Sequence, residues 1–333
     1  MTHAAPAGTP HRPTARRRTL AALALAGLVT ASGAVIAQER AVKLILPVAT
    51  ASGVDTITRA AQPALAKALG HPVVVENQPG AGGIVGTQAL VKSPPDGYTL
   101  SIVSNNHVIY PSVYKSLPFD PVADITPIAV IGSTPIVLVV NPKVPAKNAQ
   151  ELIALMKAKP DEINYASSGN GTILHLAAAM FLDQAGVKAK HIPYKGVGPM
   201  VTDLLGGQVD FGALSLPSVQ QHIKAGTLRA IGVATQKRLA AAPEIPTFAE
   251  QGMPNYLVEG WFAVIGPAKM PAALVAKINA EVKQAFAAPD VVEAMAKQGN
   301  TIDVSTPDYA AKFFPSELAK YAALVKKAGV ELQ

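Results

Sequence analysis

Short runs of apolar and β-branched residues alternate along the chain with segments whose apolar residues recur every three or four positions. The runs predict strands and the spaced segments predict helices. Gly70 follows one helical segment as a C-cap residue, and Pro94 ends the next. The predicted strands are 42–46, 73–76, 98–103, 136–140, 164–166, 191–193, 209–213, 228–234 and 258–265. The predicted helices are 55–69, 83–92, 149–159, 172–185, 199–206, 271–287 and 308–328.

This alternation predicts an α/β fold built from βαβ units, with a mostly parallel sheet. The 333 residues are enough for two lobes of ordinary domain size, and no low-complexity linker or internal repeat divides them. In open α/β sheets a ligand lies beyond the carboxyl ends of the strands. The loops that follow the strands are therefore the places to search for a site.

The N-terminus has the layout of a secretory signal peptide. Arg16–Arg18 form a positive segment, Leu20–Val29 an apolar one, and small residues lead to a predicted cleavage site after Ala37. A membrane anchor is the alternative, but the apolar stretch is shorter than the roughly 20 residues a spanning helix needs. The arginines loosely resemble a twin-arginine signal, so both export routes stay open. The sequence predicts an exported, periplasmic protein.

Composition narrows the function further. The formal charge is +7, but residues 1–37 hold four arginines and no acidic residue, so only a small positive surplus remains elsewhere. No basic run or basic-aromatic pattern follows, which argues against nucleic-acid binding. The chain contains no cysteine, which excludes disulfides, a lipoprotein anchor and thiolate metal sites.

The loop after the strand at 164–166 has the composition of an anion site. It reads SSGNGT over residues 167–172 and leads into a predicted helix. Small residues let backbone N–H groups converge at a helix N-terminus, whose partial positive charge favours a carboxylate or phosphate. An ordinary Ser or Asn cap is an equally good interpretation. The absence of Lys and Arg from this loop favours a carboxylate.

The loop at 47–55 is similar in composition and also leads into a helix. Asp55 and Arg59 are four residues apart, so we expect them to pair on the helix surface, with Asp55 acting mainly as a cap.

Patterns typical of enzymes fail. Gly80 and Gly82 begin a G-x-G-x-x-G pattern, but residue 85 is Val and no acidic residue follows at the required distance. The seven histidines include no H-x-x-x-H pair, and no G-x-S-x-G elbow occurs. His175 is interpreted as structural, and Trp261 as a core or interlobe residue. We therefore predict no enzymatic activity, no cofactor and no metal.

An ordered series of motifs resembles the Bug proteins, the periplasmic solute receptors of tripartite tricarboxylate transporters. The resemblance covers nearly all of the chain after the signal peptide. The matching stretches are PVVVENQPGAGG at 72–83, PDGYTL at 95–100, SSGNGT at 167–172 with His175-Leu176, PYKG at 193–196, LGGQVD at 205–210, PTFAEQG at 246–252, and Trp261.

The resemblance implies a type II periplasmic-binding-protein fold, in which two α/β lobes close on a ligand in the cleft between them. The first lobe would span 38–133 and 258–333, and the second 134–257. Carried onto this chain, the family's binding loops imply contacts from both lobes. The implied ligand-binding residues are Thr50, Ser52, Gly53, Asn106, Ser167, Gly169, Asn170, Gly171, Thr172, Tyr194 and Ser215.

The resemblance also implies a function: monomeric capture of a small organic carboxylate for the membrane components of a tripartite transporter. A sensor subunit that presents its ligand to a membrane signalling protein is the alternative, and an exported enzyme is a weaker one. Ala51-Ser52 stands where the family usually has two glycines. Since glycine permits left-handed backbone, we expect this pair to restrict the first loop.

Overall fold

The computed structural model describes residues 1–5, 40–160 and 162–330. The chain divides into two units, Met1–Glu39 and Arg40–Gln333, and all helices and strands described below belong to the second unit. Residues 6–39, which include most of the predicted signal peptide and Ala37, lie outside the described residues, so cleavage there stays a prediction.

A sheet runs through the second unit with the strand order β2-β1-β3-β9-β4-β7-β5-β6, and β8 and β10 each pair with β4. The strands are β1 Val42–Leu46, β2 Val73–Asn77, β3 Thr99–Ser104, β4 Ile125–Val140, β5 Asn164–Ser167, β6 Lys190–Pro193, β7 Phe211–Ser215, β8 Arg229–Val233, β9 Glu259–Pro267 and β10 Thr301–Ile302.

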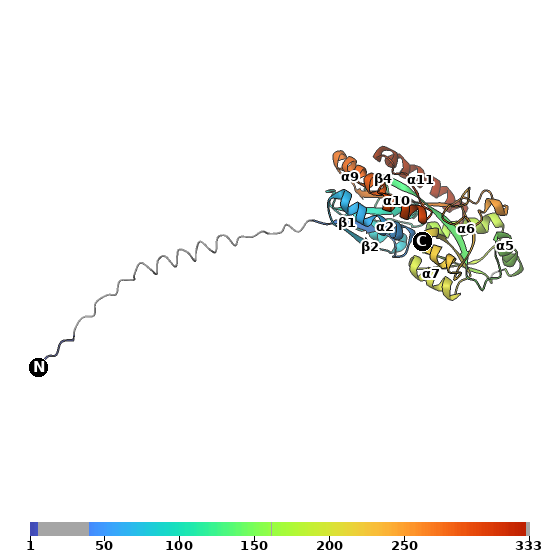
Figure 1. Cartoon of the computed structure of the whole chain (residues 1–333), viewed down its shortest axis with the longest axis horizontal. Coiled ribbons are helices and arrows are strands. Elements are labelled where there is room, and N and C mark those ends of the chain that lie inside the picture. The colour runs from blue at the N-terminus through green and yellow to red at the C-terminus, as the bar shows by residue number, and fades with distance from the viewer. Residues whose placement is uncertain (6–39, 161, 331–333) are drawn as a thin grey trace. The chain divides into compact units, whose positions relative to one another are not determined.

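β4 is the strand that joins the two halves of this sheet. Its first part pairs with β9 as far as Pro135, and its second part pairs with β7 from Ile136. Figure 1 shows β4 running from the half that holds β1 and α2 towards the half that holds α6 and α7. The described chain therefore forms two α/β lobes. We propose the boundaries that the sequence predicts, because the exchange of partners on β4 falls beside residue 134.

The sheet is mixed, so the prediction of a mostly parallel sheet is wrong. β1 pairs in parallel with β2 and β3, and β5 pairs in parallel with β6 and β7. The pairings of β4 and β9 given by the described residues are antiparallel. Each lobe keeps its βαβ units, whereas the strands that pass between the lobes run opposite to their neighbours.

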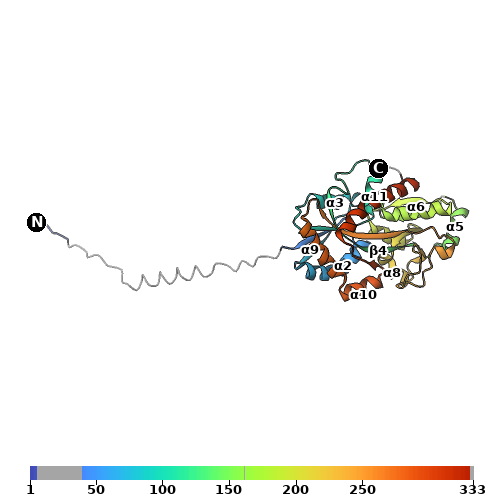
Figure 2. The ribbon, with the colours of Figure 1, turned by 90° about the horizontal axis from the view of Figure 1, so that it is seen from above.

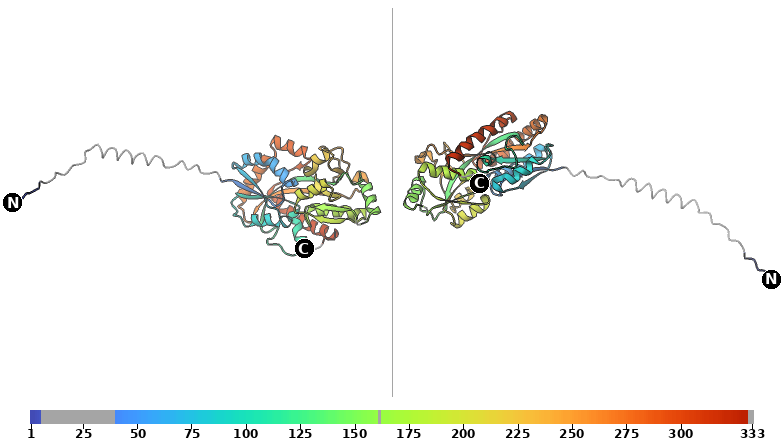
Figure 3. Two further views of the ribbon diagram at one scale, coloured as in Figure 1. Left: turned by 90° about the horizontal axis from the view of Figure 1, so that it is seen from below. Right: turned by 180° about the vertical axis from the view of Figure 1, so that it is seen from behind.

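Helices pack on both lobes. α2 and α9 bury Ile57 and Phe286 against Leu44 of β1 in one core, and α6 buries Phe181 beside Phe211 of β7 in the other. Figure 2 shows α2 and α9 in one half of the second unit and α6 in the other, and Figure 3 shows the two halves from other sides. The helices are α2 Gly53–Leu69, α3 Ile84–Val91, α4 Asn106–Ile109, α5 Ala149–Ala158, α6 Ile173–Ala185, α7 Val197–Gly206, α8 Leu216–Lys224, α9 Ala272–Phe286, α10 Pro289–Lys297 and α11 Pro307–Lys327. Three short 3₁₀ turns are η1 Ala81–Gly83, η2 Tyr110–Ser112 and η3 Ala249–Gln251.

Side-chain and glycine caps set the ends of the helices that lead from the cleft. Ser52 caps α2 and Thr172 caps α6, and both side chains accept a backbone N–H from the third helical residue. Gly70 and Gly186 end these helices with φ of 70° and 62°, a left-handed conformation that glycine adopts readily.

The sequence missed α4, α8, α10 and β10, together with the first part of β4. Pro127, Gly132 and Pro135 interrupt that part of β4, and proline normally argues against a central strand. Within the described residues, no helix combines the length and apolar character needed to span a membrane.

Candidate ligand-binding cleft

A cavity of about 600 Å³ lies between the lobes. The N-cap residues of six helices line it, and four of these helices have nine or more residues. The N-cap residues of these four are Ser52 of α2, Thr172 of α6, Gly196 of α7 and Ser215 of α8. A helix N-terminus carries roughly half an elementary positive charge on N–H groups without intrahelical partners. Four such ends, contributed by both lobes, make the cavity attractive to an anion.

The lining of the cavity carries almost no formal charge. Among the described residues around it, Lys195 is the charged side chain, and it is exposed. Val54, Ile136 and Trp261 add apolar surface to the lining, beside the helix ends. The cavity therefore suits an anion that is held by neutral donors and has an uncharged body.

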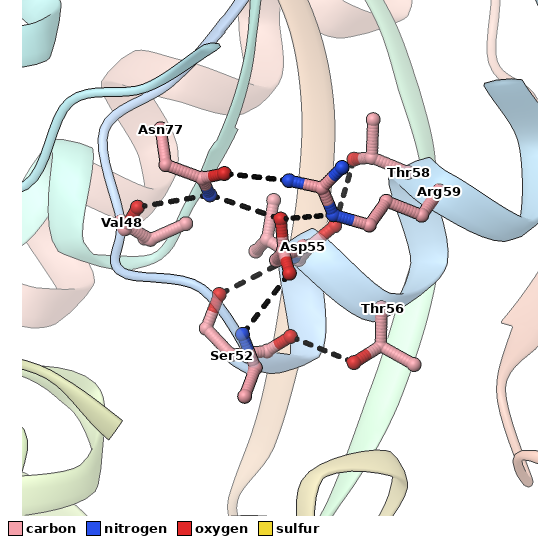
Figure 4. A network of polar contacts seen from close by, with 9 residues as sticks. Val48, Ser52, Asp55, Thr56, Thr58, Arg59 and Asn77 are labelled. Atoms are coloured by element: carbon pink, nitrogen blue, oxygen red, sulfur yellow. Dashed lines mark hydrogen bonds and ion pairs between the residues drawn. The ribbon is translucent and has the colours of Figure 1, made fainter. Parts of the chain in front are cut away.

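The first-lobe loop is fixed by a polar network around Asp55 (Figure 4). Asp55 Oδ2 accepts the Ala51 N–H at 3.0 Å, and Oδ1 accepts from Arg59 Nε and Asn77 Nδ2, both at 2.9 Å. Asn77 Nδ2 also donates to the carbonyl of Val48 at 3.3 Å. The predicted pair of Asp55 and Arg59 is present, but the cap of α2 is Ser52 rather than Asp55.

Ala51 corrects the expectation for the first loop. Its φ is 63°, so alanine takes the left-handed conformation that the family's glycine would supply. The hydrogen bond from its N–H to the buried carboxylate of Asp55 holds this conformation. The Ala51-Ser52 pair therefore keeps the left-handed turn instead of preventing it.

The hydroxyl of Thr172 in the second-lobe loop is engaged within the protein. Thr172 Oγ1 donates to the carbonyl of Gly169 at 2.8 Å. It accepts from Ser168 Oγ at 3.2 Å and from the His175 N–H at 3.4 Å. Thr172 shapes the loop, and its hydroxyl has no further proton to give to a ligand.

Backbone N–H groups remain as donors at the helix ends. The N–H groups of Gly53 and Val54 in α2, and of Asn170 and Leu174 around the start of α6, have no hydrogen-bond partner among the described residues. All four residues line the cavity. These backbone N–H groups are therefore available as donors for an anion, together with the Ser52 hydroxyl, which accepts the Asp55 N–H and donates to no group among the described residues.

The hydroxyl groups of Tyr194 and Ser167, two predicted binding residues, contact other protein side chains. The Tyr194 hydroxyl donates to Asp203 Oδ2 at 2.7 Å; burial first, and then this bond, raises the pKa of Tyr194 to about 12. Ser167 Oγ lies 2.6 Å from His191 Nε2. That pair has the spacing of a nucleophile and base, but Ser167 is fully buried and does not line the cavity. Burial also lowers the pKa of His191 to about 4, which makes it a poor base at neutral pH.

The lobes touch each other at glycines around the cavity. A Cβ added to Gly53 would lie 2.5 Å from Ser215 Oγ, and one added to Gly196 would lie 2.5 Å from Ala49 Cβ. A Cβ added to Gly171 would overlap the side chain of Val113. We call these three pairs the cross-lobe glycine contacts. They show that the two lobes are in close contact in this conformation.

Asn106 adds a hydrogen bond between the lobes. Its Oδ1 accepts the Ile173 N–H at 2.9 Å, so a first-lobe side chain satisfies the first N–H of the second-lobe helix α6. Asn106 lines the cavity, as the sequence predicts, but its acceptor is engaged by the protein.

Comparison with known proteins agrees with the motifs. Residues 57–330 match the tripartite tricarboxylate transporter family receptor. The chain belongs to this family. Protein BugT of Bordetella pertussis is 36% identical to this receptor over 313 residues, which cover 93% of the receptor and 96% of BugT.

Solved structures of related proteins have the same fold as this receptor. The periplasmic binding protein BugD has a TM-score of 0.84 at 31% identity, covering 89% of the receptor and 99% of the BugD chain. An R. palustris protein with adipate has a TM-score of 0.85 at 29% identity, covering 88% of the receptor and 99% of that chain. The predicted two-lobed periplasmic-binding-protein fold is confirmed.

The structure brings most of the predicted binding residues of the receptor to one cavity. Those that line it are Ser52, Gly53, Asn106, Gly169, Asn170, Thr172, Tyr194 and Ser215. Thr50, Ser167 and Gly171 do not line it, because they lie behind the loop surface or at the contact between the lobes. Whether the lining residues touch a ligand stays a prediction.

Sequence reasoning missed several residues of the cavity wall. Tyr114, Thr134 and Ile136 reach it from segments with no motif, and Ala81 and Gly82 reach it from the glycine-rich turn before α3. The available signal for Ala81 and Gly82 was that their turn follows the predicted strand 73–76.

Proposed function

We propose that this receptor captures a small organic carboxylate by closing its lobes, and delivers it to a tripartite tricarboxylate-type membrane transporter. This proposal rests mainly on one observation: the N-termini of α2, α6, α7 and α8, which come from both lobes, converge on one cavity, and the exposed Lys195 is the one charged side chain among the described residues that line it. Neutral N–H donors in a site without bulk water bind an anion more strongly than they would in water. The relative whose structure includes adipate supports a carboxylate as the ligand class.

Lobe closure is supported by the cross-lobe glycine contacts. Residues on separate lobes approach so closely that a single added methyl group would collide. Such contacts fit a closed conformation, in which the ligand is enclosed and its bonds are shielded from water.

We further infer that the mature receptor is a periplasmic monomer, produced by cleavage after Ala37. It needs no cofactor, binds no nucleic acid and catalyses no reaction on its ligand. The signal-like N-terminus and the periplasmic relative support the location. The buried position of Ser167 supports binding rather than catalysis, since its hydroxyl cannot reach a molecule in the cavity.

Native mass spectrometry of the exported protein, followed by a thermal-shift screen, tests the proposal. We expect a mature mass that begins at Gln38, together with a melting temperature raised by one class among mono-, di- and tricarboxylates. Selective binding to the folded state stabilises it, by about 2.7 kcal/mol at a hundredfold excess over Kd. Trp261, the single tryptophan of the chain, lines the cavity, so its fluorescence gives a second readout.

The outcomes separate the rival functions. A broad carboxylate panel that changes neither melting temperature nor fluorescence would contradict the carboxylate assignment. Conversion of a bound acid would indicate an enzyme. A membrane pull-down that recovers a signalling protein instead of a transporter would favour the sensor.

Replacing Asn106 by alanine should weaken acid binding about tenfold. The change removes the bond between the lobes and leaves the Ile173 N–H unpaired on closure, and an unpaired buried group costs about 1–3 kcal/mol. Calorimetric titration with the acid found in the screen measures the effect. Gln88→Ala, a half-buried α3 residue outside the cavity, is the control. Equal affinities for Asn106→Ala and wild type would show that this bond does not stabilise the bound state.

A further inference from the structure

Two stacked imidazoles lie behind the Ser167–Thr172 loop. The rings of His175 on α6 and His191 on β6 are 3.9 Å apart at an interplanar angle of 9°. Tyr165 of β5 extends the stack, with its ring 4.8 Å from His191. Neither histidine lines the cavity, so any part they play in binding must act through the loop.

Each histidine holds a different end of the loop. The Gly171 N–H donates to His175 Nδ1 at 3.0 Å, next to the N-cap of α6. His191 Nε2 lies 2.6 Å from Ser167 Oγ, which also accepts the Gly169 N–H at 3.2 Å. The rings therefore fix the backbone on both sides of Asn170, whose N–H has no partner among the described residues.

The arrangement requires neutral rings. His175 Nδ1 accepts a hydrogen bond, which a protonated imidazole cannot do. Burial, and then the neighbouring His191, lower the pKa of His175 to about 3, and burial lowers that of His191 to about 4. Tyr165 is the other titratable side chain stacked on the pair among the described residues, and burial raises its pKa to about 12. All three groups are thus uncharged at neutral pH.

We propose that His175 and His191 are positioning residues that set the backbone donors of the Ser167–Thr172 loop for the carboxylate. The inference rests on the proposed function, and it assigns the shape of the second-lobe binding surface to two side chains that touch no ligand. Loss of either hydrogen bond frees one end of a loop with two left-handed glycines, Gly169 at φ 138° and Gly171 at φ 66°. A freed loop spreads its donors over several conformations, which weakens binding.

Paired substitutions separate positioning from packing. His175→Asn keeps an acceptor near the Nδ1 position, and His191→Gln keeps a polar atom near Nε2, whereas leucine at either position keeps bulk and removes the hydrogen bond. His222 of α8 lies outside the cavity, so His222→Leu is the control. The probes are adipate, malate and benzoate, and amide hydrogen exchange of Gly171 is followed by NMR without any probe.

The leucine variants should show at least tenfold faster Gly171 exchange and about tenfold weaker binding of whichever probe the wild type prefers. The Asn and Gln variants should recover most of both. Wild-type exchange rates and affinities in the leucine variants would overturn the proposal. Equal losses in the polar and leucine variants would also overturn it, because packing alone would then be responsible. The wild type could also bind none of the three acids while Gly171 exchange is still faster in the leucine variants. That result would uphold the positioning role of the histidines and reject the carboxylate function.

Discussion

Replacing Gly53 by alanine is expected to lower the affinity of the receptor for its acid by about five- to 140-fold while leaving each lobe folded. The new Cβ would lie 2.5 Å from Ser215 Oγ and 3.0 Å from Ser215 Cβ across the cleft. Overpacking of this kind costs about 1–3 kcal/mol, and every 1.4 kcal/mol is tenfold in binding. The clash exists only when the lobes touch, so the whole penalty falls on the closed, bound state.

Gly53 is a suitable position for this test because alanine can adopt its backbone conformation without strain. It is the first residue of α2 and has no positive φ, unlike Gly171 and Gly196, where any side chain would also strain the backbone. Alanine is the better helix former, by up to about 1 kcal/mol in a helix interior. The melting temperature without ligand should therefore stay unchanged or rise slightly.

A rescue and a control complete the Gly53 experiment. Ser215→Gly added to Gly53→Ala removes both atoms that the new methyl meets, and glycine is an acceptable N-cap, so the double variant should bind the acid as tightly as Ser215→Gly alone. Gly198→Ala is the matched control, because its Cβ would meet nothing closer than Thr50 O at 3.9 Å. Calorimetry gives the affinities, and small-angle scattering follows closure. Full affinity in Gly53→Ala alone would mean that binding does not bring these residues together.

The local elements of the fold were predictable because they depend on neighbours in the sequence. β1 spans the predicted residues, and α6 ends at Ala185, the last residue of the predicted helix 172–185. β4 was recognised only in part, because its prolines argue against a strand and its partner β9 lies more than 100 residues away. Register between such distant strands leaves no local pattern.

In the candidate site, too, the features set by neighbouring residues were predictable and the contacts between distant residues were not. The loops after the predicted strands 42–46 and 164–166 consist of small residues and lead into helices, and the sequence therefore located the cleft, although it assigned the cap of α2 to Asp55 instead of Ser52. It did not reveal what the hydroxyls of Ser52 and Thr172 do, since a cap uses the same atoms that a ligand would. The cross-lobe glycine contacts and the Asn106 bond join residues of different lobes, so no spacing along the chain predicts them.

Acidification from pH 7 to pH 4.5 should lower the free energy of unfolding by several kcal/mol. Burial lowers the pKa of His107 to about 4, and the pKa values of His175 and His191 are lowered to about 3 and about 4. The ordinary value is 6.5, so between these limits the unfolded chain binds protons that the folded protein does not. The stabilisation is complete above pH 6.5 and is lost as the pH falls towards the folded values.

A substitution at His107 measures how much of this pH dependence comes from a single histidine. Its Nε2 donates to the carbonyl of Pro121 at 2.6 Å, and its ring packs between Phe119 and Phe314 in the first lobe, far from the loop histidines in sequence. A lowering from 6.5 to about 4 corresponds to roughly 3 kcal/mol. His107→Gln keeps a donor near Nε2 and does not titrate, so it should remove about this much of the pH dependence.

Urea unfolding of the wild type and of His107→Gln, His175→Asn and His191→Gln at half-unit steps from pH 7.5 to 4.5 measures these contributions. Each substitution should flatten the curve even where it lowers stability at pH 7. The surface carboxylates Asp120, Glu250 and Glu293 have lowered pKa values, because of backbone hydrogen bonds for Asp120 and Glu250 and of Lys297 for Glu293, so the stability that they contribute is lost at lower pH than that of the histidines. A wild-type curve that is flat between pH 7 and 5 would mean that these rings gain protons in the folded protein, and would contradict the neutral stack behind the loop.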